Sequence, residues 1–385
     1  MKIIADENMS AATEIFAPYG DVEVLPGRDI NAAHVATADV LLVRSVTRVN
    51  AQLLAHSRVQ FVGSATIGTD HIDRHFLQQK GIHFAHAPGC NAEAVVQYMF
   101  SVFCTLEPQW RDKTIGIVGC GNVGGRLLRR LSSLGVACRV YDPFLSKAEC
   151  ASLTTLETVL EADIICLHTP LTREGPWPTH HMIDQRVLAQ NIRPGALLIN
   201  AGRGGVIDNS ALLAHLHSGA DLKVALDVWE NEPDINRDLL QQIHLATPHI
   251  AGYSVEGRLR GTQMVRDAMC RCLDLTLKDL PHNARAAQGF TEAFAGSLRL
   301  EAGQGLEEAI LHSYQVGTDD RQMRSALKGV ENSAGENQLA QGTGRLFDAL
   351  RKHYTQRREF SHYRINGPGA SACTAALELL GFQRG

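Results

Sequence analysis

The stretch TIGIVGCGNVGGRLLRRL, residues 114–131, decides the fold. It begins with an apolar run typical of a buried strand, continues as GCGNVG at residues 119–124, and ends in a run with helical periodicity. A GxGxxG sequence alone is a weak signal, but between a strand and a helix it is typical of a dinucleotide-binding turn. The first glycine would allow the tight turn, the second would let the backbone approach a pyrophosphate, and the third would let the helix pack on the strand.

The next predicted strand, residues 137–141, ends in an acid. Asp142 stands about twenty residues beyond the glycines, where a carboxylate accepts hydrogen bonds from both ribose hydroxyls. The same charge repels a 2′-phosphate, so the sequence favours NAD over NADP. The alternative is a glycine-rich turn beside a solvent-facing Asp. We predict that the following residues contact NAD: Gly119, Gly121, Asn122, Val123, Gly124 and Asp142.

Short apolar runs alternate with helix-like segments on both sides of this turn. This alternation predicts parallel sheets joined by crossover helices. Beyond Pro281 the sequence becomes richer in small and polar residues, which indicates an appended module. Six strands from the turn onward are the number in a complete dinucleotide-binding sheet. Strands are predicted at residues 2–5, 22–25, 40–43, 60–63, 114–118, 137–141, 164–168, 196–200, 223–227 and 243–247, and long helices at 91–106 and 254–279.

The composition restricts the kinds of partner. The 385 residues include 37 basic and 41 acidic side chains, and the net charge of −4 gives no general attraction to nucleic acid or an anionic membrane. No apolar run approaches the roughly 18 residues that cross a bilayer, and the N-terminus MKIIADENMS lacks the apolar segment of a signal peptide. The nine cysteines are scattered without a CxxC pair, so the sequence predicts no metal site and favours the reducing cytoplasm.

Three later strand ends carry charged or titratable side chains: Arg203 in NAGRGG, Glu232 in DVWENEP and His249 in TPHIAGY. In an open parallel sheet, ligands bind at the carboxyl ends of the strands. Removing a hydride from a hydroxyl leaves a proton that a histidine takes, and a neighbouring carboxylate fixes the tautomer of that histidine. An arginine binds a carboxylate through its planar fork. Each residue alone would more simply be a capping, turn or loop residue, but together behind an NAD site they indicate a dehydrogenase.

At these residues the chain resembles the D-isomer-specific 2-hydroxyacid dehydrogenases. The resemblance runs from about residue 35 to about residue 280. It implies His249 as general acid/base, Glu232 as its carboxylate partner and Arg203 as the anchor of the substrate carboxylate. The matching pieces are GCGNVG at 119–124, HTPL at 168–171, NAGRG at 200–204, DVWENEP at 227–233 and PH at 248–249. Further cofactor contacts are implied for Thr169, Pro170, Asp227 and Gly252.

The resemblance also implies a two-lobed α/β fold. A Rossmann-type NAD-binding domain would span residues 93–252, and a flavodoxin-like substrate domain would comprise residues 1–92 and 253–284. Residues 285–385 would form a C-terminal α+β domain that makes a homodimer.

Several features differ from the generic family and narrow the substrate. The loop TREGPWPT at residues 172–179 is longer than usual, Tyr253 follows the histidine motif, and the C-terminal segment is additional. These features are similar to those of members that oxidise a phosphorylated four-carbon hydroxy acid, which implies Ser45, Thr66 and Tyr253 as substrate contacts. The phosphate of that small molecule needs a second cationic anchor, for which Arg44 is the candidate.

Two alternatives stay open. The chain could act on 3-phosphoglycerate, glyoxylate or hydroxypyruvate, as other members do, or it could be an NAD-sensing binding protein. Arg357 and Arg358 in the tail could approach the phosphate site of the partner in a dimer, although a solvated basic helix face is the simpler interpretation.

Overall fold

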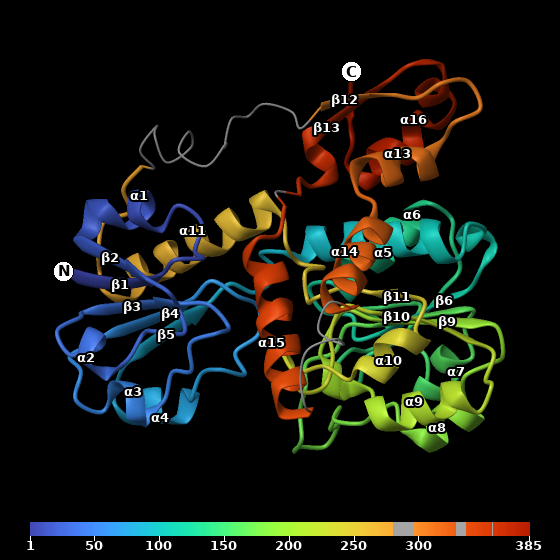
Figure 1. The fold of residues 1–385 in the computed structure, drawn as a ribbon. Helices are drawn as coiled ribbons and strands as arrows, with labels where there is room; N and C mark the ends of the chain where they lie inside the picture. Colours follow the sequence, from blue (N-terminus) through green and yellow to red (C-terminus); the bar gives the residue numbers. More distant parts are fainter. Residues whose placement is uncertain (280–295, 329–335, 356) are drawn as a thin grey trace. The chain divides into compact units, whose positions relative to one another are not determined.

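The computed structural model describes residues 1–279, 296–328, 336–355 and 357–385. The chain divides into two compact units (Figure 1). The first comprises Met1–Ala92 and Tyr253–Ala295, and the second comprises Glu93–Gly252 and Gly296–Gly385. The domain boundary predicted between residues 284 and 285 lies outside the described residues.

The first unit is a parallel sheet covered by helices on both faces. Its strand order, β2-β1-β3-β4-β5, is the flavodoxin-like order that we predicted. In Figure 1, α1 and α11 lie on one face, and α2, α3 and α4 lie on the other. Every side chain of β3, VLLV, is buried, as expected of a strand covered on both sides. The elements are β1 (Lys2–Asp6), α1 (Ala12–Phe16), β2 (Asp21–Leu25), α2 (Ala32–Val35), β3 (Val40–Val43), α3 (Ala51–Leu54), β4 (Phe61–Ser64), α4 (Arg74–Gln79), β5 (His83–His86) and α11 (Val255–Cys272).

The second unit contains the dinucleotide-binding sheet. Its strand order is β11-β10-β9-β8-β6-β7, and all its strand pairs are parallel. Helices α5 and α6 pack on one face, and α7 to α10 pack on the other (Figure 1). The elements are α5 (Ala92–Leu106), β6 (Ile115–Val118), α6 (Gly124–Ser133), β7 (Cys138–Tyr141), α7 (Leu156–Leu160), β8 (Ile164–Leu167), α8 (Gln185–Gln190), β9 (Ala196–Asn200), α9 (Asn209–His217), β10 (Leu222–Leu226), α10 (Arg237–Gln242) and β11 (Leu245–Ala246).

This sheet is a Rossmann sheet in which the third strand is reduced to a bridge. Val140 of β7 pairs with Leu153 in parallel, at the place where a third strand would lie outside the second. The order therefore reverses between β6 and β8, which are neighbours in the sheet. Ligands of such sheets bind at this reversal, beyond the carboxyl ends of the strands.

The C-terminal module packs into the second unit. Buried apolar side chains of the module share a core with α5 and α6, among them Leu306, Ile310 and Leu377. Met323, Leu327 and Phe347 join the core on the opposite face of the sheet. The elements are β12 (Gly296–Arg299), α13 (Leu306–Ser313), α14 (Val316–Lys328), α15 (Glu336–Lys352), β13 (Tyr363–Asn366), α16 (Pro368–Leu380) and β14 (Gln383–Arg384). The predicted α/β class with an additional C-terminal α+β part is therefore confirmed.

Among the described residues, no helix combines the length and the apolar character needed to span a bilayer.

Candidate active site

The glycine turn joins β6 to α6. Gly119 has a φ of 89°, which glycine adopts without strain. A Cβ on Gly124 would lie 1.9 Å from the carbonyl oxygen of Gly119, so only glycine lets α6 begin directly against the turn. Apart from Gly121 and its two chain neighbours, no described residue has an atom within 4 Å of the place of a Cβ on Gly121, which leaves space for a pyrophosphate. Asn122 and the N-cap residue Val123 complete the turn, and the helix N-terminus offers its N–H groups to an anion.

Asp142 follows β7, and its carboxylate lies beside the glycine turn. Oδ2 accepts a hydrogen bond from the backbone N–H of Cys120 at 2.9 Å, and Oδ1 accepts one from that of Phe144 at 3.0 Å. An ionised carboxylate has about four acceptor positions, so lone pairs remain for ribose hydroxyls. Burial raises the pKa of the Cys120 thiol to about 11.

The end of β8 presents buried polar atoms that lack partners. Both ring nitrogens of His168 and Oγ1 of Thr169 have no hydrogen-bond partner among the described residues. Burial lowers the pKa of His168 to about 4, so its ring is neutral at physiological pH. Such atoms indicate where a bound molecule supplies the missing hydrogen bonds. Pro170 follows, and its carbonyl accepts a hydrogen bond from Oγ1 of Thr179 at 2.6 Å, which ties down the long loop after β8. Together with the open glycine turn, these residues fit a dinucleotide.

Arg203 stands in a loop that the side chain of Asn200 folds at the end of β9. The Asn200 amide donates to the carbonyl of Arg203 at 2.9 Å, and its oxygen accepts from the N–H of Gly202 at 3.1 Å. Nη1 of Arg203 donates to the carbonyl of Gly202 at 2.8 Å. The next residue, Gly204, lies so close to Trp229 that a Cβ would be 1.9 Å from the Trp229 carbonyl carbon and oxygen. The loop that carries Arg203 therefore touches the loop that follows β10.

Glu232 and His249 form a hydrogen-bonded pair. Nδ1 of His249 lies 2.7 Å from Oε2 of Glu232, and Oε1 of Glu232 accepts the N–H of Trp229 at 2.8 Å. Burial by itself would raise the pKa of Glu232, but the charge and hydrogen bond of His249, with help from Arg351, lower it overall. Because an ionised carboxylate only accepts, Nδ1 carries the proton and Nε2 is left to accept one.

Asp227 fixes the segment that carries His249, which we call the His249 loop (residues 247–251). One carboxylate oxygen accepts from Oγ1 of Thr247 and the N–H of Ile250, each at 2.7 Å, and both oxygens accept from the N–H of Ala251 at 3.1 and 3.0 Å. Burial raises the pKa of Asp227, while the charge of His249 and these hydrogen bonds oppose the rise. The φ of His249 is 56°, an unusual value for a residue with a side chain. Gly252 follows the loop directly.

The other predicted substrate residues belong to the first unit. Arg44 and the exposed Ser45 follow β3, and Thr66 follows β4, where its hydroxyl lies 2.7 Å from that of Ser64. The guanidinium carbon of Arg44 lies 5.3 Å from the ring centroid of Tyr253. Arg258 of α11, which sequence reasoning missed, lies 4.5 Å from the same ring. The structure thus gathers two cations around one aromatic ring, and the only signal for Arg258 was its place one turn into the helix after Tyr253.

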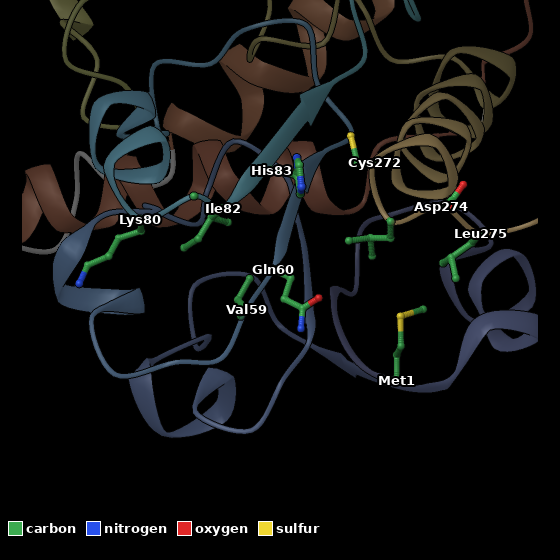
Figure 2. Close-up of a pocket in the computed structure, with 11 residues that line it drawn as sticks. Met1, Val59, Gln60, Lys80, Ile82, His83, Cys272, Asp274 and Leu275 are labelled. Carbon is green, nitrogen blue, oxygen red and sulfur yellow. The ribbon is translucent and has the colours of Figure 1, made fainter.

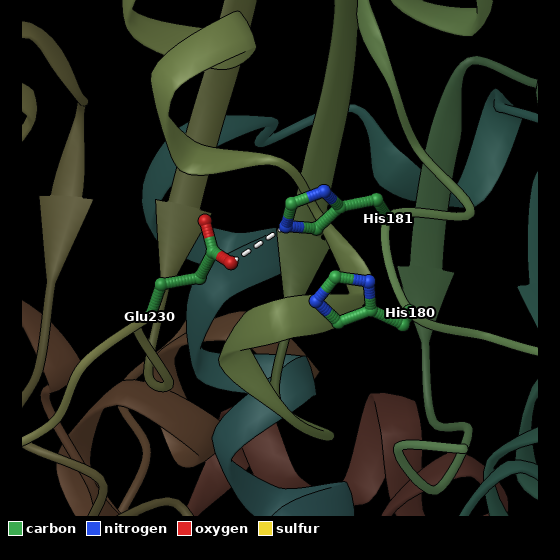
Figure 3. A group of neighbouring side chains, drawn as sticks. All are labelled: His180, His181 and Glu230. Atoms are coloured by element: carbon green, nitrogen blue, oxygen red, sulfur yellow. Dashed lines mark hydrogen bonds and ion pairs between the residues drawn. The ribbon is translucent and has the colours of Figure 1, made fainter. Parts of the chain in front are cut away.

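His180, His181 and Glu230 form a second group of titratable side chains (Figure 3). Nε2 of His181 lies 2.7 Å from Oε1 of Glu230, and the two imidazole rings stack with centroids 3.9 Å apart. Their potential ligand atoms lie within 4.8 Å of one another, so the group could hold a metal ion, which the sequence did not predict. Oε2 of Glu230 also accepts the N–H of Asn209 at 2.9 Å. These bonds make the group a brace between loops of the NAD-binding sheet.

The described part of the first unit also contains a pocket of about 580 Å³ (Figure 2). It opens at the amino ends of the strands, since Met1, Gln60 and Ile82 precede β1, β4 and β5. Ligands of parallel sheets bind at the opposite, carboxyl ends. The predicted substrate residues Ser45 and Thr66 follow carboxyl ends, so this pocket is separate from them.

Comparisons with known proteins agree with this geometry. Residues 100–251 match the D-isomer specific 2-hydroxyacid dehydrogenase, NAD binding domain, and residues 293–381 match a domain of unknown function. The solved structures of an Entamoeba histolytica 3-phosphoglycerate dehydrogenase and an Aquifex aeolicus D-lactate dehydrogenase are similar in fold. The first is 23% identical to this chain, with a TM-score of 0.63, and the match covers 72% of this chain and 97% of that one. The second is 21% identical, with a TM-score of 0.62, and the match covers 71% of this chain and 95% of that one.

Relatives at higher identity match nearly the full length. A Teredinibacter turnerae protein is 47% identical over 98% of this chain and 98% of its own length, and a Klebsiella pneumoniae protein is 43% identical over 99% and 98%. Both are named erythronate-4-phosphate dehydrogenase.

The fold and the matching NAD-binding domain define an NAD-dependent enzyme of the D-isomer-specific 2-hydroxyacid dehydrogenase class. Within this class, the chain belongs to the erythronate-4-phosphate dehydrogenase family. The predicted enzyme class and the NAD cofactor are confirmed, and the interpretation as a mere NAD-sensing protein loses its support.

Proposed function

We propose that this enzyme oxidises the C2 hydroxyl of 4-phospho-D-erythronate with NAD⁺, giving 3-hydroxy-2-oxo-4-phosphobutanoate, NADH and a proton, as a step in pyridoxal 5′-phosphate biosynthesis. The observation that carries the proposal is the His249–Glu232 pair, at 2.7 Å, on the carboxyl side of an NAD-binding sheet. The full-length similarity to relatives named for this substrate supports the choice of hydroxy acid.

His249 acts as the general base in this proposal. Its Nδ1–H is held by the Glu232 carboxylate, so Nε2 takes the proton of the C2 hydroxyl while the hydride leaves C2. Glu232 stabilises the imidazolium that forms. When bound, NAD⁺ supplies the hydride acceptor. Arg203 binds the substrate carboxylate and polarises the developing carbonyl at C2.

The cofactor residues keep the roles that the sequence predicts. The glycine turn binds the pyrophosphate, Asp142 binds the ribose hydroxyls, and Thr169 and Pro170 line the cofactor. Gly252 contacts the cofactor through its backbone. The buried carboxylate of Asp227 is engaged with the His249 loop, so we assign it the role of shaping the wall beside the nicotinamide.

The phosphate of the substrate needs cations of its own. Arg44 and Arg258 gather around Tyr253, which supports a phosphate anchor in which Tyr253 holds the two guanidinium groups. Ser45 and Thr66 supply hydroxyl contacts to the substrate. A plain hydroxy acid has one carboxylate, which Arg203 binds in this proposal. The additional pair of arginines therefore favours a substrate that also carries a phosphate.

We also propose that the enzyme works as a homodimer in the cytoplasm, with no nucleic acid or membrane partner. We retain domain boundaries of 1–92 with 253–284, 93–252, and 285–385 as part of the proposal. Size-exclusion chromatography with light scattering tests the dimer.

The decisive experiment follows NADH formation with purified protein, NAD⁺ and equal concentrations of 4-phospho-D-erythronate, 3-phosphoglycerate or D-glycerate. We expect kcat/KM to be highest for the phosphorylated four-carbon acid. Preference for a three-carbon acid would keep the mechanism and replace the substrate. If no acid is oxidised, tightly bound NADH must first be discharged with a 2-oxo acid, and continued inactivity then refutes the proposal.

A further inference from the structure

Residues of the C-terminal module hold both flanks of the His249 loop. On one flank, Oδ1 of Asp320 in α14 accepts the N–H of Ala246 at 2.8 Å. On the other flank, Nη2 of Arg357 donates a hydrogen bond to the carbonyl of Ala251. The same nitrogen donates to the carbonyl of Ala94 in α5 at 3.3 Å. The catalytic histidine therefore stands in a loop whose two ends are tied to a segment outside the dinucleotide-binding sheet.

Arg357 is a buried cation, surrounded by aromatic side chains and a buried carboxylate. Only 6% of the residue is exposed, so the solvated face expected from the sequence is wrong for Arg357. Its guanidinium carbon lies 4.2 Å from the ring centroid of Tyr314. The hydroxyls of Tyr314 and Tyr354 both donate to Oδ2 of Asp319 at 2.8 Å, which supplies a buried counter-charge.

Burying an arginine is costly unless its charge and its N–H groups are compensated. Within the described part of the chain, Nε and Nη1 of Arg357 have no hydrogen-bond partner, and Nη2 donates to two backbone carbonyls. Replacing a buried ion pair by apolar residues of similar volume is often neutral or stabilising, so stability alone does not explain a buried arginine at this position. Its hydrogen bond to the carbonyl of Ala251 indicates that the side chain holds the His249 loop in place.

We propose that Arg357 is a positioning residue of the active site, which fixes the His249 loop through the carbonyl of Ala251. The C-terminal module then completes the catalytic site in addition to any role in dimerisation. The kinetic part of the test rests on the proposed function, and the structural part does not.

The backbone of the loop explains why a second tether is needed. His249 has a positive φ, and such a conformation persists only where the surroundings over-determine it. The peptide groups around Ala251 are held on the N–H side by Asp227 and on the carbonyl side by Arg357. Loss of the second tether lets the loop relax, and the ring of His249 then leaves the Glu232 carboxylate for part of the time.

The test compares Arg357→Met with Arg358→Met in the full-length enzyme. Arg358 is the matched control because it is the adjacent arginine, and Gln97 donates to its backbone carbonyl, which every substitution keeps. Hydrogen exchange followed by mass spectrometry should show that the amides of Ile250 and Ala251 exchange faster in Arg357→Met than in the wild type. In the control, their exchange rate should not change. With NAD⁺ and 4-phospho-D-erythronate, kcat of Arg357→Met should fall on the order of tenfold or more, because misplacement of a catalytic group is costly.

A general loss of folded protein is distinguished by NADH binding. Arg357→Met should still bind one NADH per chain, and the pH profile of its kcat should shift in the same direction as that of Glu232→Gln. If Arg357→Met does not fold, Arg357→Lys keeps the charge beside Asp319 and should give an intermediate exchange rate. Unchanged exchange in the His249 loop, or a loss of rate that equals the loss of NADH sites, overturns the inference. If the wild type ignores 4-phospho-D-erythronate, the proposed function fails while the exchange data still decide the role of Arg357.

Discussion

Gly204→Ala should damage catalysis without damaging cofactor binding. A Cβ on Gly204 would lie 1.9 Å from the carbonyl carbon and oxygen of Trp229 and 2.6 Å from the N–H nitrogen of Glu230. Real Cβ contacts are essentially never shorter than 3.0 Å, so the two loops must separate by about 1 Å. One loop carries Arg203, and the other contains Trp229, whose N–H fixes Glu232.

A displacement of about 1 Å at a catalytic group costs on the order of 10²-fold in rate. We therefore expect kcat/KM of Gly204→Ala to fall by about that factor, with a higher KM because Arg203 moves. The assay is NADH formation at varied 4-phospho-D-erythronate, together with NADH fluorescence titration and thermal unfolding. NADH affinity should stay close to that of the wild type, because the glycine turn is untouched.

Gly205→Ala is the matched control, since it adds the same methyl group one residue further along the same turn. There a Cβ would meet the methyl groups of Leu171 at 3.4 Å, which is ordinary contact. Its activity should stay close to that of the wild type. Near-normal kcat/KM in Gly204→Ala would refute the reasoning, and equal losses in both variants would show that the turn tolerates no side chain for another reason.

Three substitutions test the remaining roles. His249→Ala should lower kcat by on the order of 10²–10⁴-fold while NADH still binds; turnover near the wild-type rate would rule out the histidine as general base. Glu232→Gln removes the carboxylate that attracts the protonated form of His249. This attraction lowers the pKa of Glu232 against the effect of its burial. Oxidation needs the neutral imidazole, so the midpoint of the rising limb of the pH–rate profile should move to lower pH, and an unmoved midpoint contradicts the pairing. Asp142→Ala removes the repulsion of a 2′-phosphate, so the ratio of kcat/KM for NADP⁺ to that for NAD⁺ should rise. An unchanged ratio would place cofactor selectivity elsewhere.

Much of the fold could be predicted because strands buried on both faces leave a strong local signal. VLLV in β3 is apolar throughout, ALLIN in β9 is apolar up to its last residue, and the structure buries every one of these side chains. β5, with the sequence HFAH, was missed because it is an edge strand whose side chains are only partly buried. Its two histidines hide the apolar pattern.

The third Rossmann strand illustrates the opposite limit. Apolar runs predict six strands in this sheet, and the structure contains six, β6 to β11. The position outside β7, where the third strand of a Rossmann sheet lies, holds only the one-residue bridge at Leu153. Bridges of one residue are set by tertiary packing and leave no periodicity in the sequence.

At the site, motifs predicted the residues whose chemistry is local. Arg203, Glu232 and His249 stand in recognisable sequences, and the structure brings Glu232 and His249 into hydrogen-bond contact. Arg258 belongs to no motif and was missed, although it lies only five residues beyond Tyr253. Arg357 was noted only as a basic residue of the tail, because its contact with Ala251 joins positions 106 apart in the sequence.

The raised pKa of the Cys120 thiol affects the sensitivity of the enzyme to oxidants. Thiolates, not thiols, attack peroxides and alkylating reagents. With a pKa of about 11, Cys120 is almost entirely protonated at neutral pH, although it lies in the turn to which we assign pyrophosphate binding. Iodoacetamide at neutral pH should therefore leave NADH binding intact long after more acidic protein thiols have reacted, and peroxide stress should spare the turn. This sulfur atom thus behaves as a small apolar side chain of the glycine turn and not as a reactive group.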